Sequence, residues 1–188
     1  MKSLLSEWGK FKGWRVLSFF LERPEDAIHI KGLSKELGIG PGTANLYLNL
    51  YLKEGLLKRE KSANAMFFRL AESPLTLNLK KTSTLLKLNN CRFVENVLKE
   101  ISCTGIALYG SHATGLNDGK SDLDVLIISR EKKLPANAIK KLEDEFGKEA
   151  NATIISLSEW RSKIRRKEGF SKSILEKHIV LYGSDLVE

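Results

Sequence analysis

Two short groups of residues in the second half of the chain carry the side chains that phosphate and metal chemistry needs. Gly110 and Ser111 directly follow the apolar run 106–109, and Asp122 and Asp124 open the next apolar run, with ten residues between Ser111 and Asp122. Glycine lets a backbone approach phosphate oxygens closely, and a strand that turns into a helix presents free N–H groups to an anion. Two aspartates two residues apart on a strand share one face, where they can hold Mg²⁺. The spacing therefore predicts a site for a magnesium-bound phosphate chain.

Around these residues the chain reads LYGSHATGLNDGKSDLDVLII, which resembles the pattern of the DNA polymerase beta-like nucleotidyltransferases, especially the minimal nucleotidyltransferases. That pattern is Gly-Ser, ten residues, then Asp-any-Asp. The resemblance covers about residues 84–184 and implies a small mixed sheet with helices on one side. It also implies that Gly110 and Ser111 bind the nucleotide, while Asp122 and Asp124 are catalytic and hold Mg²⁺. The implied reaction moves a nucleoside monophosphate from a nucleoside triphosphate to a hydroxyl acceptor.

One part of the pattern is missing. The family usually carries a third carboxylate on the next strand, where this chain reads ATIISLS and has Thr153. That acid would ligate a metal and help to deprotonate the attacking hydroxyl, which threonine cannot do. Asn151 would share the face of Thr153 without a charge, and Glu145, Glu149 or Glu159 are candidates to substitute. An active transferase and a nucleotide-binding but catalytically weak domain both remain open.

Two other positions differ from the family in a milder way. His112 and Thr114 stand where the family often has an aromatic residue and an arginine. The absence of the arginine would remove one interaction with phosphate, because a guanidinium binds phosphate through charge-assisted hydrogen bonds.

The first half of the chain is basic and has different patterns. Residues 1–90 hold 15 Lys and Arg against 8 Asp and Glu, and residues 91–188 hold 16 against 15, so the first half carries nearly all of the net charge of +8. A basic excess favours a polyanionic partner, although a solvated surface also produces it. Apolar spacing and turn residues predict helices at 14–22, 31–37 and 43–54, with Thr43 as the last helix's cap, and strands at 27–30, 56–60 and 65–70.

This order resembles a winged helix-turn-helix over about residues 12–72. In its DNA-binding members the helix after the turn enters the major groove and the wing contacts phosphates. The resemblance makes six residues candidates for DNA binding, namely Thr43, Asn49 and Lys53 on the helix and Lys58, Arg59 and Lys61 on the hairpin. Leu46 and Leu50 lie on the same outward face and are poor base readers, so docking to a protein, a second subunit or the other domain is the alternative.

The patterns together predict an α+β chain with three segments. A winged helix-turn-helix occupies residues 1–75, a linker or the start of a connecting helix occupies 76–90, and the nucleotidyltransferase domain occupies 91–188. The stretch 71–82 lacks a period and is expected to be irregular, with a strand at 76–79 as the alternative, before a helix at 83–101. A helix at 135–146, a strand at 151–157, a helix from about Ser158 and a closing HIVLYGSD segment complete the second domain.

Composition limits the class of protein. No apolar run reaches the ~18 residues of a membrane helix, the first ten residues are charged rather than like a signal peptide, and the two cysteines lack metal-site spacing. We therefore expect a cytoplasmic protein with no membrane partner. The expected partners are a nucleoside triphosphate, DNA through the winged helix, and a protein acceptor or toxin partner, with a homodimer left open. The alternative to a transferase is a transcriptional regulator whose second domain senses nucleotide or only dimerises.

Overall fold

The computed structural model describes residues 7–62, 64–184 and 186 of the 188-residue chain. Most of the N-terminal stretch assessed above for a signal peptide, and one residue of the predicted hairpin turn, lie outside the described residues. The chain is a mixed α+β protein with two compact units, residues 1–83 and 84–188, and each unit has its own sheet. Among the described helices, none combines the length and the apolar character that crossing a membrane requires.

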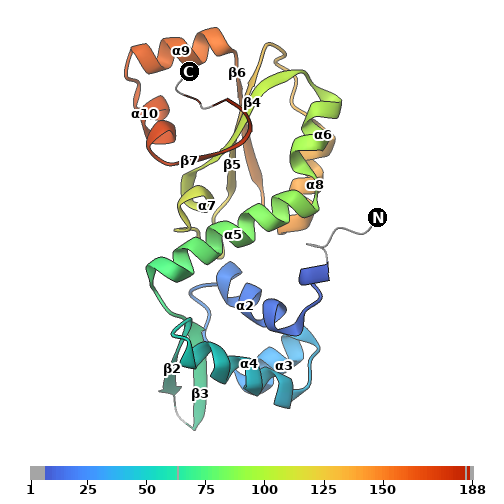
Figure 1. The fold of residues 1–188 in the computed structure, drawn as a ribbon, viewed down its shortest axis with the longest axis vertical. Helices are drawn as coiled ribbons and strands as arrows, with labels where there is room; N and C mark the ends of the chain where they lie inside the picture. The colour runs from blue at the N-terminus through green and yellow to red at the C-terminus, as the bar shows by residue number, and fades with distance from the viewer. Residues whose placement is uncertain (1–6, 63, 185, 187–188) are drawn as a thin grey trace. The chain divides into compact units, whose positions relative to one another are not determined.

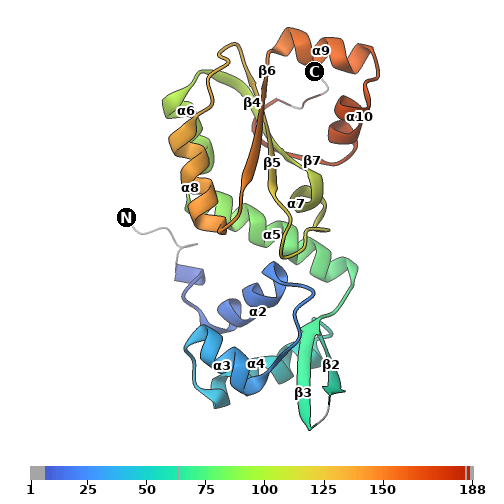
Figure 2. The same ribbon diagram turned by 180° about the vertical axis from the view of Figure 1, so that it is seen from behind.

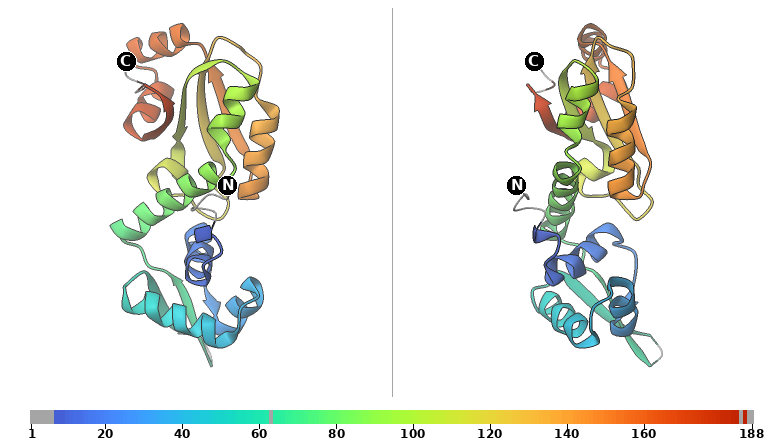
Figure 3. Two further views of the ribbon diagram at one scale, coloured as in Figure 1. Left: turned by 45° about the vertical axis from the view of Figure 1, so that its right-hand side comes forward. Right: turned by 90° about the vertical axis from the view of Figure 1, so that its right-hand side faces the viewer.

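The elements of the first unit follow in the order that the sequence predicts. They are α2 (Lys12–Glu22), β1 (Ile28–His29), α3 (Ile30–Leu37), α4 (Pro41–Lys53), β2 (Leu57–Ser62) and β3 (Ala65–Leu70). The sheet has the order β1-β3-β2 and is antiparallel, and the β2–β3 hairpin extends beyond the helices of its unit (Figure 3). Val16, Phe20, Leu33, Leu48 and Phe68 are buried in the core between helices and sheet.

The start of α4 differs from the prediction that Thr43 caps it. The helix begins at Pro41, with Gly40 in the N-cap position, so Thr43 lies in the first turn. Proline is favoured at the first helical position because its fixed φ suits the helix and its missing N–H has no partner there in any case.

The predicted irregular linker over 71–82, and the alternative strand at 76–79, are both wrong. Helix α5 (Pro74–Asn90) occupies this stretch and crosses the point at which the two units divide. Its start is capped reciprocally, because Thr76 N donates to Ser73 Oγ (3.2 Å) and Ser73 N donates to Thr76 Oγ1 (3.0 Å). A capping box of this kind fixes a helix start without any apolar period.

The helix predicted over 83–101 is two helices. After α5 ends, Arg92 has a left-handed φ of +51°, and α6 (Phe93–Glu100) follows. A left-handed residue interrupts the run of helical backbone, so the apolar period on either side of it belongs to separate helices.

The second unit contains a four-stranded mixed sheet. Its elements after α6 are β4 (Cys103–Tyr109), α7 (Gly110–Thr114), β5 (Leu123–Ser129), α8 (Ala136–Phe146), β6 (Ala150–Ile155), α9 (Leu157–Arg165), α10 (Gly169–Glu176) and β7 (His178–Gly183). The strand order is β6-β5-β4-β7, with β5 and β6 parallel and the other pairs antiparallel. The mixed sheet was predicted, whereas α10 was not.

Helices cover both faces of this sheet, and not one face as the resemblance implied. Helices α6 and α8 lie on one side and α9 and α10 on the other, as the opposite views of Figures 1 and 2 both show. Alternate residues of β5 separate into two cores, with Val125 and Ile127 packed beside Phe93 and Leu142, and Leu126 beside Trp160 and Ile174. Strands that are buried on both faces read as continuous apolar runs, which hides the second helical layer from sequence analysis.

Candidate functional site

The end of β4 and the start of β5 bring the predicted glycine and one predicted aspartate together. Tyr109, the last residue of β4, pairs with Asp124 in the antiparallel ladder, and Gly110 follows it. Gly110 has a left-handed φ of +70°, and a Cβ placed on it would overlap Asp124 Oδ2 and lie 3.2 Å from Asp124 Cγ. Only glycine fits beside this carboxylate without displacing it.

Asn151 connects the two predicted aspartates. It is the register partner of Asp124 across the parallel β5–β6 pair, so both side chains lie on one face. Its Nδ2 lies 3.4 Å from Asp122 Oδ2 and 3.5 Å from Asp124 Oδ1, which are long hydrogen bonds that the amide donates to both carboxylates. The sequence predicted that Asn151 and Thr153 share one face of the strand. The position of Asn151 between the two aspartates depends on the strand register, which the sequence did not predict.

Asp124 is a half-buried carboxylate that has a second carboxylate, the exposed Asp122, close to it. Burial raises the pKa of Asp124 above its usual value, the hydrogen bond from Asn151 lowers it, and the charge of Asp122 raises it. Burial likewise raises the pKa of Tyr109, with a contribution from the charge of Asp124, against the hydrogen bond with Thr153. The phenol of Tyr109 therefore stays protonated at neutral pH and can donate a hydrogen bond.

Thr153 does not occupy the place closest to the two acids. It pairs with Leu126, two residues further along the strands than the Asp124–Asn151 pair, and its Oγ1 lies 3.4 Å from Tyr109 Oη. No His, Cys, Asp or Glu of the described residues joins the two aspartates in a group of three that could hold a metal. The substitutes considered from sequence, Glu145, Glu149 and Glu159, are therefore not part of such a group.

The loop between α7 and β5 holds Asp122 in position from several sides. Asp118 Oδ1 accepts hydrogen bonds from Ser121 Oγ (2.7 Å) and Lys120 N (2.9 Å), and these bonds lower the pKa of Asp118. Lys148 Nζ donates to the carbonyl oxygen of Asp118 at 2.9 Å. Leu123 N, directly after Asp122, donates to Glu149 O at 3.1 Å and so links the starts of β5 and β6.

His112 has a structural place in this arrangement. It is buried, its ring is edge-on to that of Phe146, and its Nε2 lies 3.3 Å from Ser121 O while its Nδ1 lies 3.2 Å from Thr84 Oγ1. A carbonyl oxygen only accepts, so Nε2 carries a proton and donates to Ser121 O, while Nδ1 forms a hydrogen bond with the Thr84 hydroxyl. This histidine fastens α7 to the loop before Asp122.

The predicted serine lies in the first turn of α7, directly after Gly110. Ser111 is half-buried, and its carbonyl oxygen accepts a hydrogen bond from Thr114 Oγ1 at 3.0 Å. The Thr114 hydroxyl donates to the backbone of α7, and this side chain has no charge with which to bind phosphate as an arginine would. The structure thus brings Gly110 against Asp124, links Asp122 to Asp124 through Asn151, and leaves Ser111 next to Gly110 in the chain.

The two carboxylates fit a divalent ion that takes most of its ligands from elsewhere. Both lie within hydrogen-bonding distance of one amide nitrogen, and the absence of a Cβ on Gly110 lets the Asp124 carboxylate lie directly against the backbone. Mg²⁺ is commonly bound through one or two carboxylates together with water and substrate phosphates. Two acids are enough for an ion that arrives with a triphosphate.

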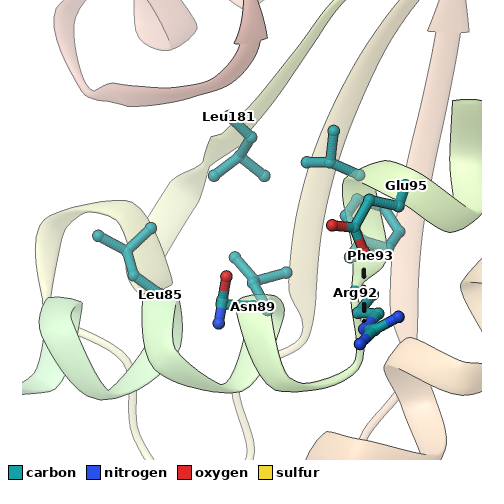
Figure 4. Close-up of a pocket in the computed structure, with 8 residues that line it drawn as sticks. Leu85, Asn89, Arg92, Phe93, Glu95 and Leu181 are labelled. Atoms are coloured by element: carbon teal, nitrogen blue, oxygen red, sulfur yellow. Dashed lines mark ion pairs between the residues drawn. The ribbon is translucent and has the colours of Figure 1, made fainter. Parts of the chain in front are cut away.

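Two pockets of the second unit lie away from the carboxylates. One of about 250 Å³ is lined mainly by apolar side chains of α5, α6 and β7, including Leu85, Phe93 and Leu181 (Figure 4). These side chains belong to the core on the sheet face opposite Leu126. The other, of about 340 Å³, involves Thr104 at the start of β4 and Trp160. Neither pocket includes Asp122 or Asp124.

The DNA-binding candidates of the first unit are spread over two elements. On α4, Asn49 and Lys53 are exposed together with Leu46 and Leu50, whereas Thr43 is half-buried. The Asn49 amide donates to Asn45 O (2.9 Å) and Asn45 Oδ1 (2.8 Å). On β2, the three basic candidates Lys58, Arg59 and Lys61 are exposed. Lys58 forms an ion pair with Glu72 at 3.6 Å.

Comparison with known proteins gives one family. No curated protein is similar enough to count as a match. A solved structure described as the crystal structure of a toxin-antitoxin with AMP-PNP is 17% identical, with a TM-score of 0.36 over 50% of this chain and 74% of that chain. The model of the nucleotidyltransferase domain family matches residues 91–184, which is half of the chain. This range contains strands β4 to β7, Gly110 and the two aspartates. Through these residues, the chain belongs to the nucleotidyltransferase domain family.

Proposed function

We propose that residues 91–188 form a magnesium-dependent nucleotidyltransferase. The domain moves a nucleoside monophosphate from a nucleoside triphosphate to a hydroxyl acceptor and releases pyrophosphate. The observation that carries this proposal is the close approach of Gly110 to Asp124, with Asp122 reached through the same Asn151 amide. This arrangement has two carboxylates for a metal and, next to them, a turn whose glycine suits a close approach of phosphate to the backbone.

The residues have separate parts in this reaction. Asp122 and Asp124 hold Mg²⁺, which supplies positive charge to the triphosphate when it is bound. Gly110 and the backbone of Ser111 at the start of α7 face the phosphates, and the serine hydroxyl is a further donor. Asn151 keeps the two carboxylates on one side of the sheet through its long hydrogen bonds.

We expect the transfer to be slow, because, among the described residues, the site has no dedicated general base to deprotonate the acceptor hydroxyl. Asn151 and Thr153 are uncharged, so proton removal falls to the two aspartates themselves. General base catalysis contributes typically about 10²–10⁴-fold, and a site without a dedicated base lacks part of that factor. A protein acceptor, including a toxin partner, follows only from the family resemblance and is the first class of acceptor to test.

The test is transfer of label from an α-labelled nucleoside triphosphate to acceptor candidates. The wild-type protein should label an acceptor in the presence of Mg²⁺, and a variant with Asp122→Asn and Asp124→Asn should not. Calorimetric titration with and without Mg²⁺ separates binding from transfer. A double variant that binds the nucleotide with Mg²⁺ as tightly as the wild type would contradict the proposal.

We further propose that residues 1–75 are a winged helix-turn-helix that binds DNA. The supporting observation is a hairpin whose first strand is exposed at all but its first residue and carries Lys58, Arg59 and Lys61. If the protein transfers nothing but retards DNA from its own upstream region, a transcriptional regulator with a nucleotide-binding domain is the better account. Exposed Leu46 and Leu50 on α4 favour the alternative in which this unit docks to a protein, and α4 variants without effect on DNA retardation would support it.

A further inference from the structure

The sheet face that carries the aspartates continues into a pair of aromatic rings. Tyr109 pairs with Asp124, so the two side chains leave the sheet on the same side. Phe170, from the first turn of α10, lies with its ring centroid 6.1 Å from that of Tyr109 and with the two planes at 85°. Two residues far apart in the chain thus form one aromatic surface beside the carboxylates.

Phe170 is an exposed aromatic side chain on α10. Its exposed fraction is 38%, whereas Ile174, one turn further along α10, is fully buried. The core on this side of the sheet includes Tyr109, Trp160 and Ile174 but not Phe170. The edge-to-face contact with Tyr109 therefore leaves part of the Phe170 ring exposed to solvent.

We propose that Phe170 is the stacking surface for the base of the bound nucleoside triphosphate. This inference rests on the proposed function, because Gly110 and the two aspartates fix the triphosphate end. Tyr109 directly precedes Gly110 in the chain and contacts Phe170, so one aromatic ring lies between the phosphate end of the site and the exposed part of Phe170. The base and the phosphates of one nucleotide then lie on the same face of the sheet.

The chemistry of the pair suits a nucleobase. Every nucleobase has a π-face, and stacking on an aromatic side chain tolerates different bases. The hydroxyl of Tyr109 lies 3.4 Å from Thr153 Oγ1, and this contact fixes the ring that supports Phe170. We therefore expect Phe170 to add affinity for any nucleoside triphosphate and to leave the choice among bases weak.

The test compares a nucleotide with the same phosphate chain lacking base and ribose. ATP and inorganic tripolyphosphate, each with Mg²⁺, are titrated calorimetrically into the full chain and into its Phe170→Ala and Phe170→Leu variants. Both variants should weaken ATP binding by about five-fold to ten-fold, at the lower end of what stacking of a base contributes, and leave tripolyphosphate binding unchanged. Leucine keeps the apolar bulk and removes only the π-face, so it guards against a loss that comes from misfolding.

A matched control is Tyr182→Ala, because Tyr182 has nearly the same exposed fraction, 39%, and lies on β7 of the same unit. It should change neither titration. Unchanged ATP binding in both Phe170 variants would overturn the inference while leaving the proposed function intact. If the wild-type protein binds neither ATP nor tripolyphosphate, the proposed function fails and this inference fails with it. No acceptor is present in these titrations, so weaker ATP binding assigns the subsite to the nucleotide and not to an acceptor base.

Discussion

Replacing Gly110 by alanine tests whether the close approach of glycine to Asp124 holds the site together. Alanine in a left-handed conformation costs about 1–2 kcal/mol of folding free energy. At Gly110 the new Cβ would also lie 3.2 Å from Asp124 Cγ and overlap Oδ2, so the carboxylate oxygen has to move by roughly 1 Å to regain an ordinary separation. A displacement of about 1 Å at a reacting centre can cost on the order of 100-fold in rate.

Gly147 provides the matched control. It also has a left-handed φ, +63°, but a Cβ placed on it meets nothing within 4 Å. Gly147→Ala should therefore be less stable by a similar ~1–2 kcal/mol in urea titration while binding and transferring nucleotide like the wild type. Gly110→Ala should show the same decrease in stability and, in addition, bind ATP with Mg²⁺ more weakly and transfer label about 100-fold more slowly.

The comparison separates a general loss of fold from a local loss of the site. If both alanine variants transfer label equally, whether at the wild-type rate or at a reduced one, the close approach of Gly110 to Asp124 has no special part and the reasoning fails. Nucleotide binding by calorimetry is the second measurement, because it reports the site even when transfer is slow.

The remaining predictions concern charge. Asn151→Asp should strengthen Mn²⁺ binding and make the thermal midpoint depend more strongly on divalent ions, because Asn151 Nδ2 lies within 3.5 Å of both carboxylates. Thr153→Asp should have a smaller effect on both quantities, and equal effects of the two variants would contradict the argument from strand register. Because burial raises the pKa of Asp124, its ionisation opposes folding, so the free energy of unfolding without metal falls as pH rises through the interval between the usual Asp pKa and that raised pKa. Asp124→Asn should then be more stable than the wild type in urea near neutral pH but not below the usual Asp range, and the opposite order would refute this. Replacing Lys58, Arg59 and Lys61 by alanine should weaken DNA retardation uniformly across sequences. It should also lower the slope of log affinity against log salt concentration by about one for each phosphate that is no longer neutralised, and an unchanged slope would exclude the hairpin from the DNA interface.

The chemistry-bearing residues of the second unit could be found from sequence because they are local. The spacing of Gly110, Ser111, Asp122 and Asp124 is a property of one strand, one turn and the next strand. Side chains two apart on a strand share a face whatever the fold around them, and an apolar run flanked by glycine predicts its own secondary structure. The resemblance to the family rested on those local residues, and the mixed sheet was what that resemblance implied.

Tertiary structure alone decided which partners these residues meet. The register of two parallel strands, which no local pattern fixes, put Asn151 and not Thr153 between the aspartates, and packing across the sheet brought Phe170 to Tyr109. The helix in place of the expected linker is a different case, because its capping bonds between Ser73 and Thr76 are local and outweighed the missing apolar period. Local sequence determines which atoms are available for chemistry, whereas distances between them depend on long-range pairing and burial, which are properties of the whole fold.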